Sequence, residues 1–267
     1  MAAMTALCGR LSRGGSRRID GGTVGMADVH ANGWFQRSTG QLAPGFRISA
    51  GDTCLDVGCG AGGMSEFAAA MGAAVIATDI DPARVAAIRG RLGRGRARSF
   101  TAFVSDSTPL PVADETATRI MCTEVLEHVA DPRAVLAELV RAGKPGAVYL
   151  LTVPDETAER LQLGLAPATY WERPNHVRIF SREGFGDMVA DAGLVIDQRL
   201  TVGFFWALWW VLFWAADQEF GEPEAPVLAS WSQTWQALIQ TRKGDEIRRT
   251  LDAFMPKSQV IVARKAA

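Results

Sequence analysis

Three ionisable side chains lie close together in the segment Glu124-Val-Leu-Glu127-His128. Positions three and four apart share a face of a helical turn, so a turn here would bring these side chains together. A further histidine, His176, lies later in the segment 171–178. Two carboxylates and two imidazoles can bind a divalent metal ion, and histidine alone can act as a general base. Two interpretations are therefore open: a metal site, or acid–base catalysis by His128 and His176.

A glycine-rich loop, Gly58–Gly63, lies within the sequence LDVGCGAGG at 55–63. Glycines allow a sharp turn and let the backbone approach a ligand that a Cβ atom would block. The spacing is G-x-G-x-G-G, whereas dinucleotide-binding loops have G-x-G-x-x-G. Asp56 lies just before the loop, and an anionic side chain there suits an ammonium or sulfonium group better than a pyrophosphate. The loop therefore indicates a cationic, nucleoside-like ligand.

A carboxylate lies at the end of each of three successive apolar runs: Asp56, Asp79 and Asp106. Asp79 is placed to accept hydrogen bonds from both hydroxyls of a ribose, and Asp106 is placed to meet an adenine edge. The carboxyl ends of parallel strands meet in the crevice where open sheets bind ligands. The three acids thus predict one binding site at that edge.

The chain that must position these residues alternates apolar runs with helical patterns from residue 53 onward, which is typical of an α/β fold. We expect a doubly wound, seven-stranded, mostly parallel sheet of the Rossmann-like type. Helices are expected over 64–71, from Pro82 toward Arg89, from near Pro132 to near Gly143, and after Ser181 as a capping residue. Strands are expected at 53–57, 74–78, 99–104, 119–123, 147–153, 194–202 and 259–263.

An insertion over 203–256 separates the last two expected strands, and its first fourteen residues hold four of the eight tryptophans. That run is shorter than the roughly 20 residues that span a bilayer. It also lacks a polar face, unlike an ordinary surface helix. One interpretation is a buried helix; the other is a helical lid that binds a large apolar acceptor, with a peripheral membrane contact as a variant. Trp231 and Trp235 are four apart, which fits a second packed helix.

The ends of the chain and its composition set further bounds. Residues 1–25 are rich in Gly, Ser and Arg, with no acid before Asp20, and are interpreted as a disordered tail or an over-extended start; the domain is expected over 26–267. The five arginines of 89–98 are interpreted as a solvated loop. Four cysteines without metal-ligand spacing indicate reduced thiols, and with no secretory signal visible they indicate a cytoplasmic protein. A net charge of −1 argues against a nucleic-acid partner.

Four segments together resemble class I S-adenosylmethionine (SAM)-dependent methyltransferases: LDVGCGAGG (55–63), VIATDIDP (75–82), SDSTPLPVAD (105–114) and MCTEVLEHVADP (121–132). The similarity covers roughly residues 45–202, with 260–265 as the final strand. It implies SAM as the cofactor. The cofactor-binding residues that it implies are Asp56, Gly58, Cys59, Gly60, Asp79, Ile80, Asp106, Ser107 and Thr123.

The Glu-x-x-Glu-His segment is similar to that of small-RNA 2′-O-methyltransferases and ubiquinone-pathway O-methyltransferases, which use a divalent ion. This resemblance implies that Glu124, Glu127, His128 and His176 are ligands of Mg²⁺ or Mn²⁺. A bound ion would lower the pKa of an acceptor hydroxyl and make it a nucleophile. The predicted function is therefore methylation of a hydrophobic or aromatic small molecule, at a hydroxyl first.

Several alternatives stay open on the sequence. Base catalysis by His128 or His176 would favour nitrogen or carbon acceptors, and a membrane-surface enzyme would act on a lipid or quinone. A non-catalytic SAM-binding protein is the alternative outside the enzymes. The glycine spacing argues against a nicotinamide-dependent oxidoreductase, and the near-neutral charge makes an RNA methyltransferase the least favoured interpretation. The oligomeric state is open.

Overall fold

One seven-stranded sheet forms the centre of the computed structural model, which describes residues 20–93 and 96–267. The strand order is β5-β4-β3-β6-β7-β9-β8; the first five pair in parallel, and β9 runs antiparallel to both β7 and β8. This confirms the predicted doubly wound, mostly parallel sheet. The strands are β3 Thr53–Val57, β4 Ala74–Asp79, β5 Ser99–Val104, β6 Ala117–Thr123, β7 Gly143–Pro154, β8 Leu194–Val202 and β9 Ser258–Lys265.

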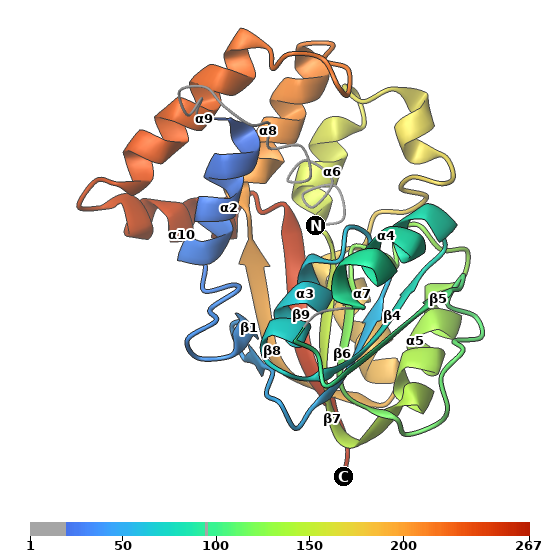
Figure 1. Cartoon of the computed structure of the whole chain (residues 1–267). Coiled ribbons are helices and arrows are strands. Elements are labelled where there is room, and N and C mark those ends of the chain that lie inside the picture. The colour runs from blue at the N-terminus through green and yellow to red at the C-terminus, as the bar shows by residue number, and fades with distance from the viewer. Residues whose placement is uncertain (1–19, 94–95) are drawn as a thin grey trace.

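Helices cover both faces of this sheet (Figure 1). On one face lie α3 (Gly63–Ala70) and α4 (Pro82–Leu92), which bury Phe67 and Ile88 in one apolar cluster. On the other lie α5 (Pro132–Ala142) and α7 (Arg182–Asp191), which bury Leu136 and Phe185 in a second cluster. A sheet that is apolar on both faces needs such a layer on each side.

Capping residues set where these helices begin. Asp81 accepts a hydrogen bond from the Ala83 N–H at 2.8 Å, ahead of Pro82 in the first turn of α4. Asp131 does the same for α5, and Ser181 accepts from the Gly184 N–H at 3.0 Å to begin α7. These starts agree with the sequence because an N-cap is a local signal.

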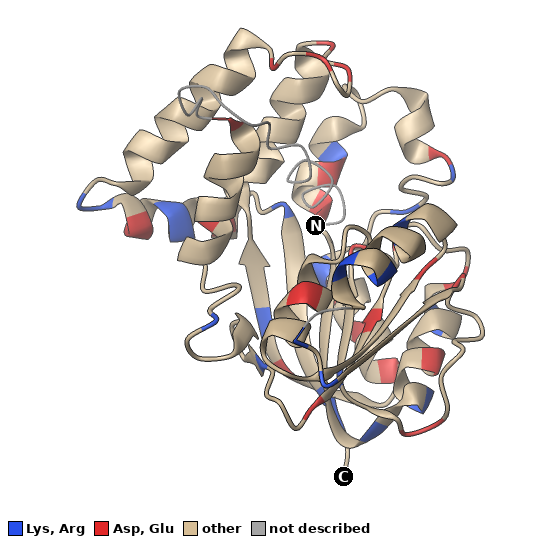
Figure 2. Cartoon of the chain, in the orientation of Figure 1, with Lys and Arg blue, Asp and Glu red and all other residues tan. Residues whose placement is uncertain are grey.

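A second group of helices lies beyond one end of the sheet (Figure 1). We call α2 (Gly21–Ala31), α8 (Phe204–Ala215), α9 (Pro226–Ile239) and α10 (Gly244–Phe254) the cap. The short α6 (Glu156–Gln162) packs against α8, and a 3₁₀ turn, η1 (Ala168–Trp171), follows it. A two-stranded hairpin, β1 (Gln41–Ala43) and β2 (Phe46–Arg47), connects α2 to the sheet. Two helices of the cap, α8 and α9, contain no charged residue (Figure 2).

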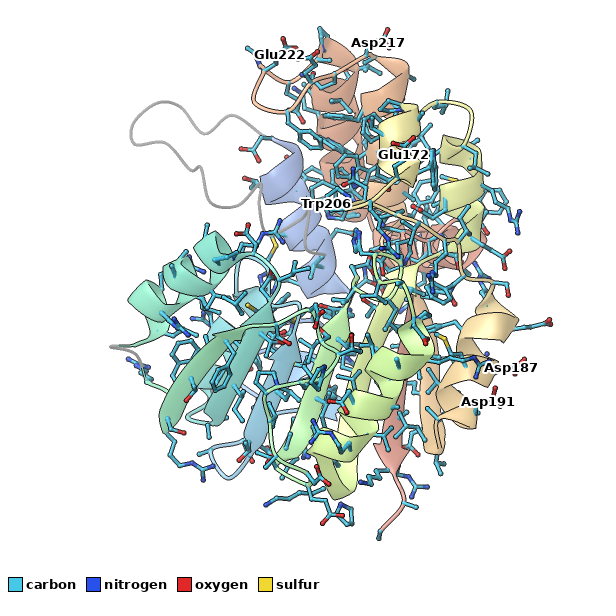
Figure 3. The ribbon with its side chains drawn as sticks, turned by 90° about the vertical axis from the view of Figure 1, so that its right-hand side faces the viewer. Glu172, Asp187, Asp191, Trp206, Asp217 and Glu222 are labelled. Carbon is cyan, nitrogen blue, oxygen red and sulfur yellow. The ribbon has the colours of Figure 1, made fainter. Side chains whose placement is uncertain are left out.

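Aromatic rings fill the interior of the cap. Phe205 and Trp231 stack with ring centroids 5.9 Å apart, and Trp235 is fully buried between α2 and α8. Most rings of the tryptophan-rich run therefore pack against one another, as expected for a buried helix. Trp206 lies at the junction of the cap and the sheet (Figure 3). No helix among residues 20–93 and 96–267 is long and apolar enough to cross a membrane.

Two expectations about irregular segments need correction. Residues 20–25, assigned to the tail, form the start of α2, where Asp20 caps the helix through the Thr23 N–H. The helix forms despite its glycines because its packing against α8 outweighs their low helix propensity. Residues 1–19 lie outside the described residues. In the arginine-rich segment, Arg89 and Arg91 belong to α4 rather than to a loop and bond to the Ala102 carbonyl and to Glu66.

Candidate functional site

The glycine loop adopts a conformation that side chains would oppose. Gly58 has φ +69° and Gly60 has φ +53°, both in the left-handed region that favours glycine. A Cβ atom on Gly58 would lie 2.3 Å from a methyl carbon of Val125. The Cys59 N–H donates to the Thr78 carbonyl at 2.8 Å, which ties the loop to β4. The loop thus closes tightly at the carboxyl ends of β3 and β4.

Two carboxylates support this loop. Asp56 is buried and accepts a hydrogen bond from the Ser65 hydroxyl at 2.6 Å; burial raises the pKa of Asp56 to about 6. Asp79 accepts from the Gly60 N–H at 2.7 Å and from the Asp81 N–H at 2.9 Å. An ionised carboxylate has about four acceptor positions, so Asp79 retains capacity for ribose hydroxyls.

The neighbouring strand ends fit a nucleoside. Ile80 follows Asp79 and is 71% exposed, which leaves an apolar surface that the face of an adenine would cover. Asp106 is exposed beyond the end of β5, the strand that pairs with β4. Ser107 is buried after it, and Thr123 is buried at the end of β6. These positions fit the predicted SAM site, and their contacts to the cofactor stay a prediction.

The structure brings Glu127, His128 and His176 together. One ligand atom of each lies within 4.8 Å of the others, and the two imidazole rings are 4.9 Å apart, edge to face. Glu127 is 1% exposed, and neither of its oxygens has a hydrogen-bond partner within the described part of the chain. Burial and the carboxylate of Glu124 raise its pKa well above the ordinary range. A buried carboxylate without partners is costly unless a ligand satisfies it.

Hydrogen bonds orient both histidines in the same sense. His128 Nδ1 lies 3.0 Å from the Pro174 carbonyl oxygen, and His176 Nδ1 lies 2.6 Å from a carboxylate oxygen of Glu159. Because a carbonyl only accepts, Nδ1 of His128 carries the hydrogen, and a carboxylate oxygen of Glu159 as the partner assigns the hydrogen to Nδ1 of His176 likewise. Nε2 of His128 then faces Glu127 at 3.6 Å. Burial, followed by the nearby His176, lowers the pKa of His128.

Glu124, the fourth predicted ligand, lies outside this cluster. Its backbone adopts a left-handed φ of +54°, and its carboxylate accepts from the Thr152 hydroxyl at 3.0 Å and from the Lys257 ammonium at 3.2 Å. The expected helical turn is replaced by a tight turn in which the His128 N–H donates to the Val125 carbonyl. That turn brings Glu127 and His128 together but directs Glu124 elsewhere.

Sequence reasoning missed two residues at this site, Glu159 and Lys257. Glu159 lies on α6 and Lys257 just before β9, far in sequence from the Glu-x-x-Glu-His segment. Neither has a local motif. The segment Asp155-Glu-Thr-Ala-Glu159 indicates only a helix start capped by Asp155, and a charged residue on a surface helix ordinarily faces solvent, so the sequence gives no signal for a buried Glu159.

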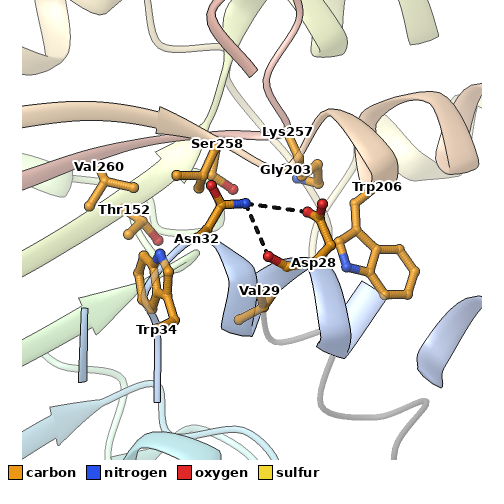
Figure 4. Close-up of a pocket in the computed structure, with 11 residues that line it drawn as sticks. Asp28, Val29, Asn32, Trp34, Thr152, Gly203, Trp206, Lys257, Ser258 and Val260 are labelled. Atoms are coloured by element: carbon orange, nitrogen blue, oxygen red, sulfur yellow. Dashed lines mark hydrogen bonds between the residues drawn. The ribbon is translucent and has the colours of Figure 1, made fainter. Parts of the chain in front are cut away.

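A small cavity of about 20 Å³, with room for about one water molecule, lies between the cap and the sheet (Figure 4). Lys257 and Thr152 line it and also bind Glu124, which precedes Glu127 and His128 in the same turn. Its walls are mostly apolar, with a few polar groups, as in small-molecule sites. The lining residues are Asp28, Val29, Asn32, Trp34, Thr152, Val202, Gly203, Trp206, Lys257, Ser258 and Val260.

The comparisons with known proteins agree with this geometry. The family model described as a methyltransferase domain matches residues 35–199. A ubiquinone biosynthesis O-methyltransferase of Xanthomonas oryzae is 34% identical over 128 residues, which cover 46% of this chain and 52% of that protein. A probable SAM-dependent methyltransferase of Mycolicibacterium smegmatis is 27% identical over 64% of this chain and 63% of that protein. The chain thus spans about half the length of the first curated relatives that it matches.

Solved structures share the fold. Geranyl diphosphate C-methyltransferase of Streptomyces coelicolor superposes with a TM-score of 0.55 at 15% identity, covering 91% of this chain and 77% of that one. The [4+2]-cyclase SpnF has a TM-score of 0.55 at 20% identity, covering 82% and 76%. These two proteins differ in chemistry, so the likeness shows the fold alone.

Proposed function

The chain belongs to the methyltransferase-domain family of class I SAM-dependent methyltransferases, and from this premise we propose that it transfers a methyl group from SAM to a hydroxyl oxygen of a hydrophobic or aromatic small molecule. The observation that carries the proposal is the convergence of Glu127, His128 and His176, close in the chain to Glu124, whose partner Lys257 lines the cavity. We place this activity in the cytoplasm, as the sequence leads us to expect.

Residues at the strand ends bind the cofactor in this proposal. Asp79 accepts hydrogen bonds from the ribose hydroxyls, and Ile80 covers the adenine. Asp106 and Ser107 lie at the adenine edge. Asp56, with Gly58 and its neighbours Cys59 and Gly60, lies by the methionine end, and Thr123 lies beside the transferable methyl. The loop contributes by position: it places the methyl at the end of β6, where the cluster begins.

The donor set fits a divalent cation. Glu127 offers two oxygens that accept no hydrogen bond from the described residues. Each histidine has Nδ1 engaged, which leaves Nε2 as the nitrogen available to a ligand. Two imidazoles with one carboxylate suit Mn²⁺ or another transition metal better than Mg²⁺. When bound, the ion would lower the pKa of the acceptor hydroxyl. In this proposal Glu127, His128 and His176 hold the ion. Glu124 is not a ligand and instead binds Thr152 and Lys257 next to the cluster.

In this proposal the acceptor enters between the cap and the sheet and widens the small cavity there, so the insertion over 203–256 acts as an acceptor-binding lid that opens. Trp34, Trp206 and Val260 supply apolar walls, and Lys257 supplies a donor near the reacting oxygen. The activity named for the curated relatives, O-methylation in ubiquinone biosynthesis, supports an apolar acceptor with hydroxyl groups. Holding the acceptor in line with the methyl contributes on the order of 7–11 kcal/mol toward the barrier of such a displacement.

A second function is favoured by one contact. The Glu159–His176 pair has the geometry of a carboxylate that orients a general base. If His176 acts alone as a base, metal is not required and nitrogen or carbon acceptors become the expected substrates.

The first experiment is a calorimetric titration of Mn²⁺ into the complex with the demethylated cofactor. Stoichiometric binding is expected in the natural protein, with at least a tenfold weaker affinity in Glu127→Gln. Glu183→Gln, at an exposed acid in the first turn of α7, is the matched control and should bind as the natural protein does. Mass spectrometry with catechol-like acceptors then tests for a methyl ether. Absence of Mn²⁺ binding in the natural protein would transfer the proposal to base catalysis by His176.

A further inference from the structure

We infer that Glu159 is a positioning residue that fixes which nitrogen of His176 faces the Glu127–His128–His176 cluster. Its role in catalysis rests on the function proposed above, but its effect on His176 does not. The inference depends on contacts that connect α6 to the segment after η1, outside the motifs that defined the site.

Glu159 is held by burial and by donors on two sides. It lies in the first turn of α6 and is 1% exposed. One carboxylate oxygen lies 2.6 Å from Nδ1 of His176, a short, charge-assisted hydrogen bond. The other accepts from the Tyr170 hydroxyl at 3.4 Å and lies 3.5 Å from the Gln162 amide nitrogen. The carboxylate therefore has little freedom to turn away from His176.

Aromatic packing holds the ring in the same place. The centroids of Tyr170 and His176 are 4.7 Å apart, and the His128 ring lies against His176 from another side. His176 is only 9% exposed, so water does not compete freely for its nitrogens. With Nδ1–H donated to Glu159, the lone pair of Nε2 is the part of the ring that remains for the cluster.

The two histidines differ in what holds Nδ1. His128 donates to a neutral carbonyl at Pro174, whereas His176 donates to a carboxylate. A carboxylate partner makes an imidazole a stronger ligand and a stronger base than a carbonyl partner does. Glu159 thus makes His176 the stronger metal ligand of the two histidines. An amide at position 159 would remove the charge. Its carbonyl oxygen would take the side where Tyr170 and Gln162 donate, so its NH₂ group would face Nδ1 and favour the opposite tautomer.

Helix α6 offers a matched control. Glu156 lies on the same helix, three residues before Glu159, and carries the same carboxylate. Its side chain bonds to the Arg182 N–H and lies 3.4 Å from Arg160, away from the cluster. Glu156→Gln therefore makes the same chemical change on the same helix without changing the partner of His176.

The experiment compares Glu159→Gln with Glu156→Gln in the full chain. In metal-free protein, ¹⁵N NMR of the histidine side chains should show His176 with hydrogen on Nδ1 in the natural protein and in Glu156→Gln. Glu159→Gln should shift His176 toward the Nε2–H tautomer and leave His128 unchanged. The Mn²⁺ affinity should fall about 10- to 100-fold in Glu159→Gln alone. Unchanged SAM affinity verifies that each variant is folded, and Glu159→Asp should recover part of the tautomer signal.

An unchanged His176 tautomer in folded Glu159→Gln would overturn the inference, whatever the metal does. An Mn²⁺ affinity equal to that of the natural protein would overturn it as well. If the natural protein binds no Mn²⁺, the metal-assisted function fails, while the NMR comparison still decides whether Glu159 orients His176. If Glu159→Gln does not bind SAM, the same comparison is made in Glu159→Asp, where a shortened reach to Nδ1 should broaden or move the His176 resonances; identical resonances would contradict the inference.

Discussion

Single buried charges at this site are compensated by partners that lie far away in sequence. Lys257 and Glu124 are 133 positions apart, yet their ammonium and carboxylate lie 3.2 Å from each other beneath the cap. Burial lowers the pKa of Lys257, but Glu124, Glu159 and Glu127 raise it, and the net direction is upward. Lys257 is therefore a cation at neutral pH, and its value to the protein depends on Glu124.

Replacing Lys257 by methionine tests that dependence. Lys257→Met keeps most of the side-chain volume but removes the ammonium from a buried carboxylate, so we expect a loss of about 3–5 kcal/mol in the free energy of unfolding. Urea titration measures it. The double variant Lys257→Met/Glu124→Gln removes both charges and should recover most of the loss. Additive effects of the two single substitutions would show that the pair has no coupling.

The residues that sequence reasoning found are those carried by short motifs. Glu127, His128 and the acids at the strand ends follow strands whose ends are marked by glycine or acid residues. Glu159 and Lys257 could not be found in the same way, because each acts through one contact made by the tertiary fold. Glu124 was assigned to the cluster from its spacing, and a left-handed backbone angle at that residue separates it. The spacing of residues does not specify the backbone angles of a turn, so it could not predict that Glu124 lies outside the cluster.

At the scale of elements, local signals account for what was predicted. Strands β3, β5 and β8 have the predicted bounds, and α4, α5 and α7 begin after their capping residues. The start of α2 was missed because Gly21, Gly22 and Gly25 suggest a loop. Gly25 is in fact required by packing: a Cβ atom there would lie 2.1 Å from the indole ring of Trp206. Long-range packing, which the local sequence does not reveal, determines where that helix begins.

Two helical glycines therefore should respond in opposite ways to alanine. Gly25→Ala forces the Trp206 ring to move and should destabilise the protein by about 1–3 kcal/mol. Gly90→Ala lies on α4, where no other side chain or distant backbone atom of the described residues comes within 4 Å of the Cβ position. It should stabilise the protein by about 0.5–1 kcal/mol through helix propensity alone. Thermal unfolding of both variants measures the difference. Stabilisation by both substitutions would show that α2 does not pack against Trp206 as described.

At the scale of the whole molecule, the cap and the sheet meet at a cavity, and buried polar groups join the cap's helices in addition to the aromatic packing. Asp28 on α2 accepts a hydrogen bond from the Trp235 indole of α9 at 2.9 Å. On α10, Arg248 pairs with Asp252, which accepts from the backbone N–H groups of Gly203 and Phe204 at the start of α8. Four helices thus depend on a small network of buried acids and one arginine. Such a network makes assembly of the cap sensitive to protonation.

Asp28 should make the stability of the protein fall as pH rises. Burial, followed by the nearby Asp252, raises its pKa from 3.8 to about 7 in the folded protein. A folded-state pKa above the unfolded value means that the stabilisation is complete below about pH 4 and is lost as pH rises to about 7, a change of up to about 4 kcal/mol. Asp28→Asn keeps an oxygen for Trp235 but does not titrate. The free energy of unfolding of the natural protein, measured against this variant at pH 5 and pH 8, should therefore drop at the higher pH. A constant difference between the two proteins would show that Asp28 is already ionised in the folded cap.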